Sequence, residues 1–193
     1  MALTPSTMLP LGTPAPDFHL PDARTGRSVG RDDFAAAPAL LVAIVCNHCP
    51  YVKHIADELA RFGRDYEKSG LAMVAISAND ATSHPEDAPQ RMSEEAKRRG
   101  YVFPYLYDET QEVAKAFHAA CTPEFYLFDR ARRLVYRGQF DDSRPGNRVK
   151  VTGRDLRAAV DAVLAGRPVD PDQKPSIGCN VKWKAGHEPD WAR

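Results

Sequence analysis

The most constraining feature of this sequence is a cysteine pair between a buried strand and an amphipathic helix. Residues 39–45 form a continuous apolar run, which is typical of a strand buried on both faces. The segment Cys46-Asn47-His48-Cys49-Pro50 follows directly. After it, apolar side chains recur at helical spacing, at Val52, Ile55, Leu59 and Phe62. The pair is therefore expected at the point where a strand turns into a helix that ends near Gly70.

The rest of the chain predicts further strands and helices. Strands are expected at 71–76, 105–107, 125–128 and 134–136, and helices at 90–99, 111–118 and 152–164, with Thr152 as the cap of the last helix. The close spacing of the last two strands favours an antiparallel hairpin. Proline-rich segments at both ends, 1–22 and 167–193, are expected to be irregular. This order predicts an α/β fold in which helices cover both faces of a mixed sheet.

Length and charge limit the class of protein. A chain of 193 residues suits a single domain, 1–193, with a core of about 10–166 and an irregular C-terminal extension over 167–193. Lys and Arg total 26, as do Asp and Glu, so the chain lacks the basic character of a nucleic-acid or membrane-surface binder. The longest apolar run is shorter than the about 20 residues of a membrane span. With no basic residue before the first apolar ones, the N-terminus does not resemble a secretory signal, and we expect a cytoplasmic protein without nucleic-acid or membrane partners.

The C-x-x-C pair predicts redox chemistry. Unpaired backbone N–H groups and the helix dipole stabilise a thiolate at a helix N-terminus, so its pKa falls below the ordinary value of about 8.5. We expect Cys46 to be the nucleophile and Cys49 to resolve the mixed disulfide. His48, between them, would stabilise the thiolate further. The dithiol is itself the redox centre, so no metal or organic cofactor is expected.

A second element is Cys121-Thr122-Pro123, just before a predicted strand. Thr122-Pro123 is a candidate cis peptide, and the alternative is an ordinary trans proline at a strand start. Cys121 and Cys179 are possible additional thiols. Cys179 could dock over the site and resolve Cys46, although packing is the simpler role for both.

Together these motifs resemble the thioredoxin superfamily. Residues 12–22 look like the N-terminal segment of its AhpC/TSA peroxiredoxin branch. The C-N-H-C-P-Y segment and the S-I-G-C-N-V-K-W segment at 176–183 are similar to a peroxiredoxin-like group with a thioredoxin-like fold. The resemblance implies that Pro123 is a cis-proline facing the cysteine pair and that it and Thr122 contact the substrate.

The sequence departs from peroxiredoxins at the position that would orient a peroxide. Counting back from Cys46, the proline and hydroxyl positions of the peroxidatic motif hold Ala39 and Ala43. Arg137 or Arg144 could supply donors only if the fold brings them to the site. We therefore predict a thiol–disulfide oxidoreductase that acts on a protein or small-molecule disulfide and is recycled by a thiol reductant, with a thiol peroxidase as the alternative.

Two further alternatives come from other classes. Cys46, Cys49, His118 and Cys121 have the residue types of a Cys3His zinc site, which would block redox activity. A thioredoxin-like binding protein with inert thiols is the other alternative, and a raised pKa at Cys46 would favour it. The acidic segment 84–87 is expected to be a surface turn.

Overall fold

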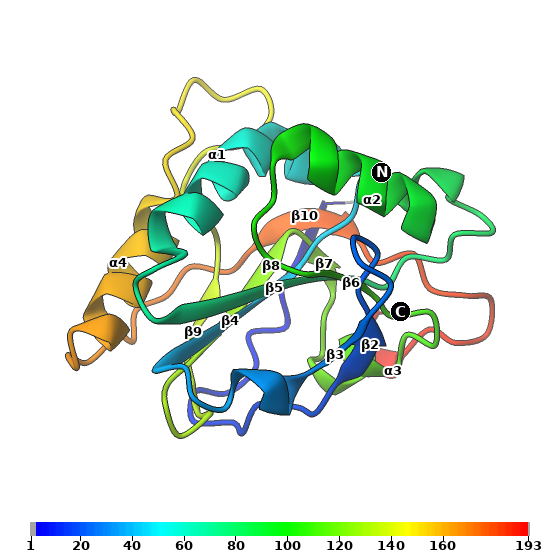
Figure 1. The fold of residues 1–193 in the computed structure, drawn as a ribbon. Helices are drawn as coiled ribbons and strands as arrows, with labels where there is room; N and C mark the ends of the chain where they lie inside the picture. Colours follow the sequence, from blue (N-terminus) through cyan, green and yellow to red (C-terminus); the bar gives the residue numbers. More distant parts are fainter. Residues whose placement is uncertain (1–2, 193) are drawn as a thin grey trace.

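A central sheet of five strands organises the protein (Figure 1). The structure is a computed structural model that describes residues 3–192, so both ends of the predicted domain 1–193 lie outside the described residues. The sheet order is β6-β5-β4-β8-β9, in which β4 pairs in parallel with β5 and antiparallel with β8. Its strands are β4 (Ala39–Ile44), β5 (Leu71–Ser77), β6 (Tyr105–Tyr107), β8 (Glu124–Phe128) and β9 (Leu134–Gly138).

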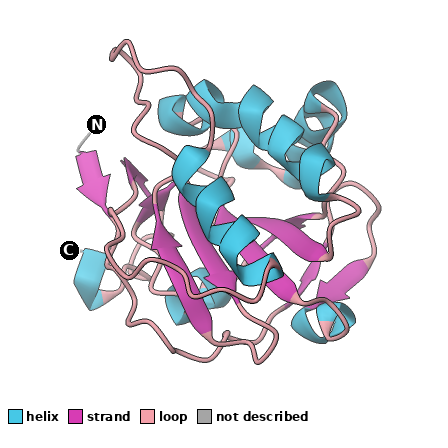
Figure 2. Ribbon diagram, turned by 90° about the vertical axis from the view of Figure 1, so that its left-hand side faces the viewer, coloured by secondary structure: helices cyan, strands magenta, loops and turns pink. Residues whose placement is uncertain are grey.

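Alternating side chains of β4 build two cores. Leu41 and Ala43 point to one face, where three helices pack: α1 (Pro50–Tyr66), α2 (Pro89–Arg99) and α4 (Arg154–Leu164). Leu40, Val42 and Ile44 point to the other face, covered by α3 (Glu112–Ala116) and by the hairpin of β2 (His19–Pro21) and β3 (Ser28–Gly30). The helices thus flank the sheet, as Figures 1 and 2 show. Burying each large aliphatic side chain contributes about 1.5–3 kcal/mol, so β4 is firmly held.

The predicted elements are present, with two local corrections. The expected helix at 111–118 is only the five residues of α3. Thr152 does not cap α4, because the cap residue is Gly153 in a left-handed conformation (φ 66°). The cause is Asp141, whose carboxylate accepts hydrogen bonds from the backbone N–H groups of Thr152 and Gly153, both at 2.6 Å.

The C-terminal extension contains a strand that was not expected. Within it, β10 (Ile177–Asn180) pairs antiparallel with both β1 (Leu3–Pro5) and β7 (Cys121–Thr122). These strands form a separate small sheet beside the end of α1, which β10 contacts (Figure 1). A strand from each proline-rich end of the chain, β1 and β10, therefore lies in one sheet with β7, the segment that precedes Pro123.

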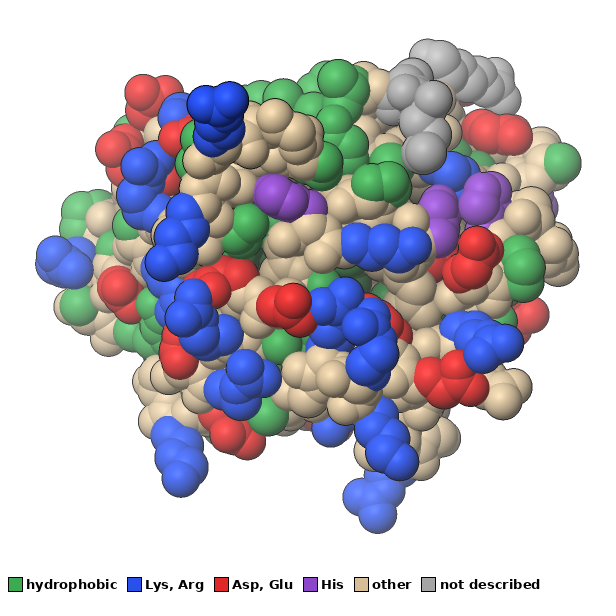
Figure 3. Space-filling view, turned by 90° about the horizontal axis from the view of Figure 1, so that it is seen from above, with side chains coloured by type: hydrophobic (Ala, Val, Ile, Leu, Met, Phe, Trp, Pro, Cys, Tyr) green, Lys and Arg blue, Asp and Glu red, His purple; other side chains and the backbone are tan. Residues whose placement is uncertain are grey.

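Charges of both signs are intermixed on the face formed by α1 and α2 (Figure 3). Ion pairs join neighbouring residues of α2, such as Arg91 with Glu94, and link the two helices through Arg99 and Asp57. Within residues 3–192, none of the helices has the length and apolar character that crossing a bilayer demands.

Candidate active site

The two cysteines of the C-x-x-C pair lie at the end of β4, and Cys49, not Cys46 as expected, is at the N-terminus of the helix. Cys46 is in the loop after the strand, whereas Cys49 is the N-cap of α1 and Pro50 its first residue. The unpaired N–H groups of the helix are therefore next to Cys49 and not Cys46. Both side chains are buried, at 1% and 0% exposure. None of the four cysteines, all of which lie within residues 3–192, forms a disulfide.

The Thr122–Pro123 peptide is cis, and it faces the cysteine pair. Two contacts join Thr122 to the pair. The hydroxyl Oγ1 lies 3.4 Å from Cys46 Sγ, and the backbone carbonyl oxygen lies 3.2 Å from Cys49 Sγ. The main chain before Pro123 is thus part of the site.

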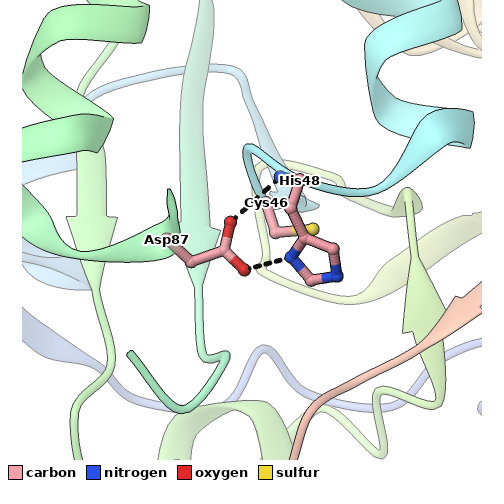
Figure 4. A group of neighbouring side chains, drawn as sticks. All are labelled: Cys46, His48 and Asp87. Atoms are coloured by element: carbon pink, nitrogen blue, oxygen red, sulfur yellow. Dashed lines mark hydrogen bonds and ion pairs between the residues drawn. The ribbon is translucent and has the colours of Figure 1, made fainter. Parts of the chain in front are cut away.

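The loop between the two cysteines is held by Asp87, which the sequence analysis wrongly assigned to a surface turn. Its side chain is fully buried. Oδ1 accepts hydrogen bonds from the backbone N–H groups of Asn47 (2.7 Å) and His48 (3.1 Å). Oδ2 lies 2.5 Å from His48 Nδ1 (Figure 4). Oδ2 also accepts a hydrogen bond of 2.8 Å from Asn79 Nδ2. One carboxylate therefore fixes both the loop and the imidazole.

The environment of Asp87 determines which nitrogen of His48 carries the proton. Burial raises the pKa of Asp87, but the hydrogen bonds from His48, Asn79 and Asn47 outweigh burial, so the net shift is downward. An ionised carboxylate can only accept, so Nδ1 must be the protonated nitrogen. Nε2 is buried and has no hydrogen-bond partner among the described residues. It is therefore the ring nitrogen that Asp87 does not engage.

The pKa values of the two thiols are in the reverse of the expected order, with that of Cys49 lowered and that of Cys46 raised. The hydrogen bond from Cys46 lowers the pKa of Cys49 to about 4, against desolvation, with help from Cys179 and the Val52 N–H. Burial, the proton donated to Cys49 and the charge of Asp87 raise the pKa of Cys46 well above its ordinary value. The neighbouring Cys46 thiol is thus the main group that lowers the pKa of Cys49, and the lowered pKa expected at Cys46 is not found there.

The remaining two cysteines differ in their relation to the pair. In the register of β7 and β10, Cys179 is opposite Thr122, and its thiol is within hydrogen-bonding range of Cys49. The thiol of Cys121 points to the carbonyl of Pro123 at 3.9 Å. Cys179 therefore joins the site, whereas Cys121 packs next to it.

The structure does not assemble the zinc set considered above. His118 is exposed and stacks on Trp191, with ring centroids 4.4 Å apart. In the described part of the chain, the residues whose potential ligand atoms gather are Cys46, His48 and Asp87, all within 4.8 Å of one another (Figure 4). In this set the Asp87 carboxylate already binds His48.

The arginines considered for peroxide binding are engaged elsewhere. The Arg137 guanidinium donates to the Leu9 carbonyl (2.9 Å) and to Gln173, and Arg144 donates to the carbonyls of Asp141 and Ser143. The hydroxyl that contacts Cys46 comes from Thr122, at a position that the peroxiredoxin motif does not use.

Asp87 and Asn79 are the site residues that sequence reasoning missed. Asn79 follows β5 by two residues, and Asp87 ends a short 3-10 helix further along the same connection. The order of the predicted strands could have indicated these two residues. The carboxyl ends of neighbouring parallel strands meet at one edge of a sheet, so polar residues after β5 belong near the motif after β4.

This arrangement defines a thioredoxin-like fold with a dithiol opposite a cis-proline, and the fold class is as predicted. The sequence matches the AhpC/TSA family over residues 11–137, more than half of the chain, and the protein belongs to that family. The family is one of thioredoxin-fold redox proteins.

Solved structures share the fold of this chain. A hypothetical protein from Sinorhizobium meliloti 1021 is 57% identical, with a TM-score of 0.93, over 95% of this chain and 100% of the other. An uncharacterized conserved protein from Geobacillus kaustophilus is 54% identical, with a TM-score of 0.93, over 95% and 97%. The thioredoxin domain of a thiol-disulfide oxidoreductase from Bacteroides vulgatus shares the fold at 16% identity, with a TM-score of 0.59, over 77% and 96%. A comparison with curated proteins found no match.

Proposed function

We propose that the protein is a thiol–disulfide oxidoreductase whose redox centre is the Cys46–Cys49 dithiol. The observation that carries this proposal is the position of both thiols, which contact Thr122 directly beside the cis-proline. A neighbouring thiol that stabilises a thiolate is what disulfide exchange requires.

In the proposed reaction, Cys46 attacks the substrate. Cys49 is enclosed by Cys46, the Thr122 carbonyl and Cys179, whereas Cys46 faces His48 and the Thr122 hydroxyl. Transfer of the Cys46 proton to the Cys49 thiolate, or to Nε2 of His48, produces the attacking thiolate. It forms a mixed disulfide and releases the first substrate thiolate. Cys49, once deprotonated, attacks the Cys46 sulfur, forms the Cys46–Cys49 disulfide and releases the second substrate thiolate.

Substrates are expected to be disulfides of proteins or small molecules, and a thiol reductant would restore the dithiol. A small cleft next to Pro123 is lined by Tyr51, His54, Arg144 and Ile177, and these are the side chains that a substrate bound beside the cis-proline would contact. We expect no additional cofactor, no nucleic-acid or membrane partner, and a cytoplasmic location.

The test is intact-mass analysis after alkylation in redox buffers of stepped potential. Wild-type protein should show a reversible two-thiol transition that Cys46→Ser abolishes. With glutathione disulfide as probe, Cys49→Ser should accumulate a mixed disulfide at Cys46, while Cys46→Ser should not form one at Cys49. A trapped adduct at Cys49 instead would reverse the two roles.

Two observations favour an alternative, a binding protein with inert thiols: both thiols are buried and the pKa of Cys46 is raised. The same experiment separates the alternatives. If the wild-type thiols stay reduced at every potential, the oxidoreductase proposal is wrong. If hydrogen peroxide oxidises the pair much faster than glutathione disulfide does, the peroxidase alternative replaces disulfide exchange.

A further inference from the structure

Cys179 has no role in the exchange reaction just described, yet the fold places it beside the dithiol. It lies in β10, is 2% exposed, and belongs to the same buried cluster as Cys46 and Cys49. In the antiparallel register it is opposite Thr122, the residue whose hydroxyl and carbonyl contact the two catalytic thiols. A strand from the C-terminal extension therefore brings a third thiol to the site.

The position of β10 is fixed from both ends. Before the cysteine, the Ser176 hydroxyl donates to the Gly138 carbonyl at 2.6 Å. After it, the Val181 N–H donates to the Ala120 carbonyl at 3.1 Å, and the Lys182 N–H donates to Asn79 at 2.8 Å. The strand lies so close to β7 that a Cβ on Gly178 would come within 2.0 Å of the Thr122 carbonyl oxygen. Cys179 is thus held in place against the site.

Cys49 lies between two thiols. Its sulfur is within hydrogen-bonding range of Cys46 on one side and of Cys179 on the other. Disulfide exchange requires an attacking sulfur in contact with the sulfur that it attacks. Cys179 meets this condition toward Cys49. The Cys121 thiol instead points to the Pro123 carbonyl.

We propose that Cys49 exchanges its disulfide partner between Cys46 and Cys179. This inference rests on the proposed function, which supplies the Cys46–Cys49 disulfide. The Cys179 thiolate attacks the Cys49 sulfur, so that the Cys49–Cys179 bond forms and the Cys46–Cys49 bond breaks. The electron pair leaves on Cys46, which takes up the proton that Cys179 lost. The exchange is redox-neutral and needs no further oxidant.

The chemical consequence is a second oxidised form of the protein. The two oxidising equivalents are stored away from the attacking cysteine, and Cys46 is restored as a thiol. Burial and the neighbouring Cys49 thiolate raise the pKa of Cys179 in the reduced protein, to about 12. Once Cys49 is in a disulfide it carries no charge, so the contribution of Cys49 to this shift disappears in the state where Cys179 must attack.

The test is disulfide mapping by mass spectrometry after proteolysis. Trypsin places Cys46 and Cys49 in the same peptide, 32–53, Cys179 in 158–182 and Cys121 in 116–130. A Cys49–Cys179 bond therefore links two peptides, whereas a Cys46–Cys49 bond lies within one. Cys46→Ala, oxidised with diamide, a smaller oxidant than glutathione disulfide, should yield the link between 32–53 and 158–182. The link should be lost in Cys46→Ala/Cys179→Ala and kept in the matched control Cys46→Ala/Cys121→Ala.

Wild-type protein held at an oxidising potential should contain both disulfides, and Cys179→Ala should retain only Cys46–Cys49. If wild type forms Cys46–Cys49 and the Cys46→Ala variant never forms the link to Cys179, the partner exchange is wrong and the proposed function stands. If wild type forms no Cys46–Cys49 disulfide, the proposed function itself fails. Cys179→Ser, which keeps a polar group of similar size, checks that a negative result does not come from misfolding.

Discussion

Oδ2 of Asp87 lies 2.5 Å from Nδ1 of His48, while Oδ1 of the same carboxylate accepts the N–H of His48. Side chain and backbone of one residue are thus bound by one buried acid. This double contact fixes the plane of the imidazole and leaves Nε2 as the ring nitrogen without a partner among the described residues. It also places a negative charge beside the cysteine pair, where it opposes ionisation of Cys46.

Asp87→Asn should therefore change two measurable properties, the pKa of Cys46 and the stability of the fold. Removing the charge should lower the pKa of Cys46, because the negative charge of Asp87 is one of the causes that raise it. Loss of the acceptor for the His48 and Asn47 donors should destabilise the fold by about 1–3 kcal/mol. Site-resolved alkylation against pH measures the first effect and urea unfolding the second. Glu86→Gln, an exposed neighbour with the same charge change, is the control, and an equal shift in both variants would contradict the assignment.

The pair should titrate in two widely separated steps. The first proton should leave Cys49 well below the ordinary thiol range, since its pKa is lowered to about 4, and the second should leave Cys46 well above that range. The ultraviolet absorbance of thiolate, followed against pH, measures both steps. Cys49→Ser should lose the acidic step, whereas Cys121→Ser should keep it. A single thiol transition near pH 9 would show that the two sulfurs do not share a proton.

The buried carboxyl of Glu124, next to the cis-proline, should make stability depend on pH. Burial raises its pKa from 4.5 to about 7, so the folded state binds more protons than the unfolded state between these values. The free energy of unfolding should fall as pH rises through this window and then level off, with a total loss of about 3 kcal/mol from this group. Glu124→Gln should remove this loss. Its free energy of unfolding, relative to that of wild type, should therefore be higher at pH 8 than at pH 4.

Urea unfolding at several pH values tests the effect of Glu124. The oxygen of Gln can still accept the N–H groups of Ala120 and Cys121 that Glu124 binds. Glu112→Gln, on the exposed side of α3, provides the matched change in charge. Parallel curves for Glu124→Gln and wild type would mean that this carboxyl does not titrate in the window.

Gly178→Ala should displace β10 from β7. The new methyl group would meet the backbone of Thr122, which cannot move aside as a flexible side chain can. We expect a loss of about 2 kcal/mol or more in the free energy of unfolding, as for overpacked sites. Ile177→Ala, a change at an exposed position of the same strand, should cost far less. Denaturant unfolding compares the two, and equal stabilities would show that β10 does not pack as closely as described.

Local patterns determined most of the architecture of this protein. The apolar run before Cys46 and the helical spacing after Pro50 correctly predicted β4 and α1. A fully buried strand and a helix buried on one side each follow from the order of apolar and polar residues along a short segment. The same holds for the hairpin of β8 and β9, which pairs within a short turn. The prediction that Pro123 follows a cis peptide rested on the resemblance to a family, since the residues alone left trans open.

Only the tertiary structure decided how the site is completed. Asp87 reads as part of a polar turn, and it becomes a buried acceptor because the parallel pairing of β4 and β5 brings their carboxyl ends together. Burial of Cys46 and the contact between the two thiols reversed the expected order of their pKa values. Cys179 lies far from the motif in sequence, and only the pairing of β10 with β7 brings it to Cys49.

The sequence by itself determined which thiols are available and which strand and helix carry the pair, because those follow from contacts between near neighbours. Which atoms surround each thiol was decided by contacts between distant segments, and these depend on the packing of the whole chain.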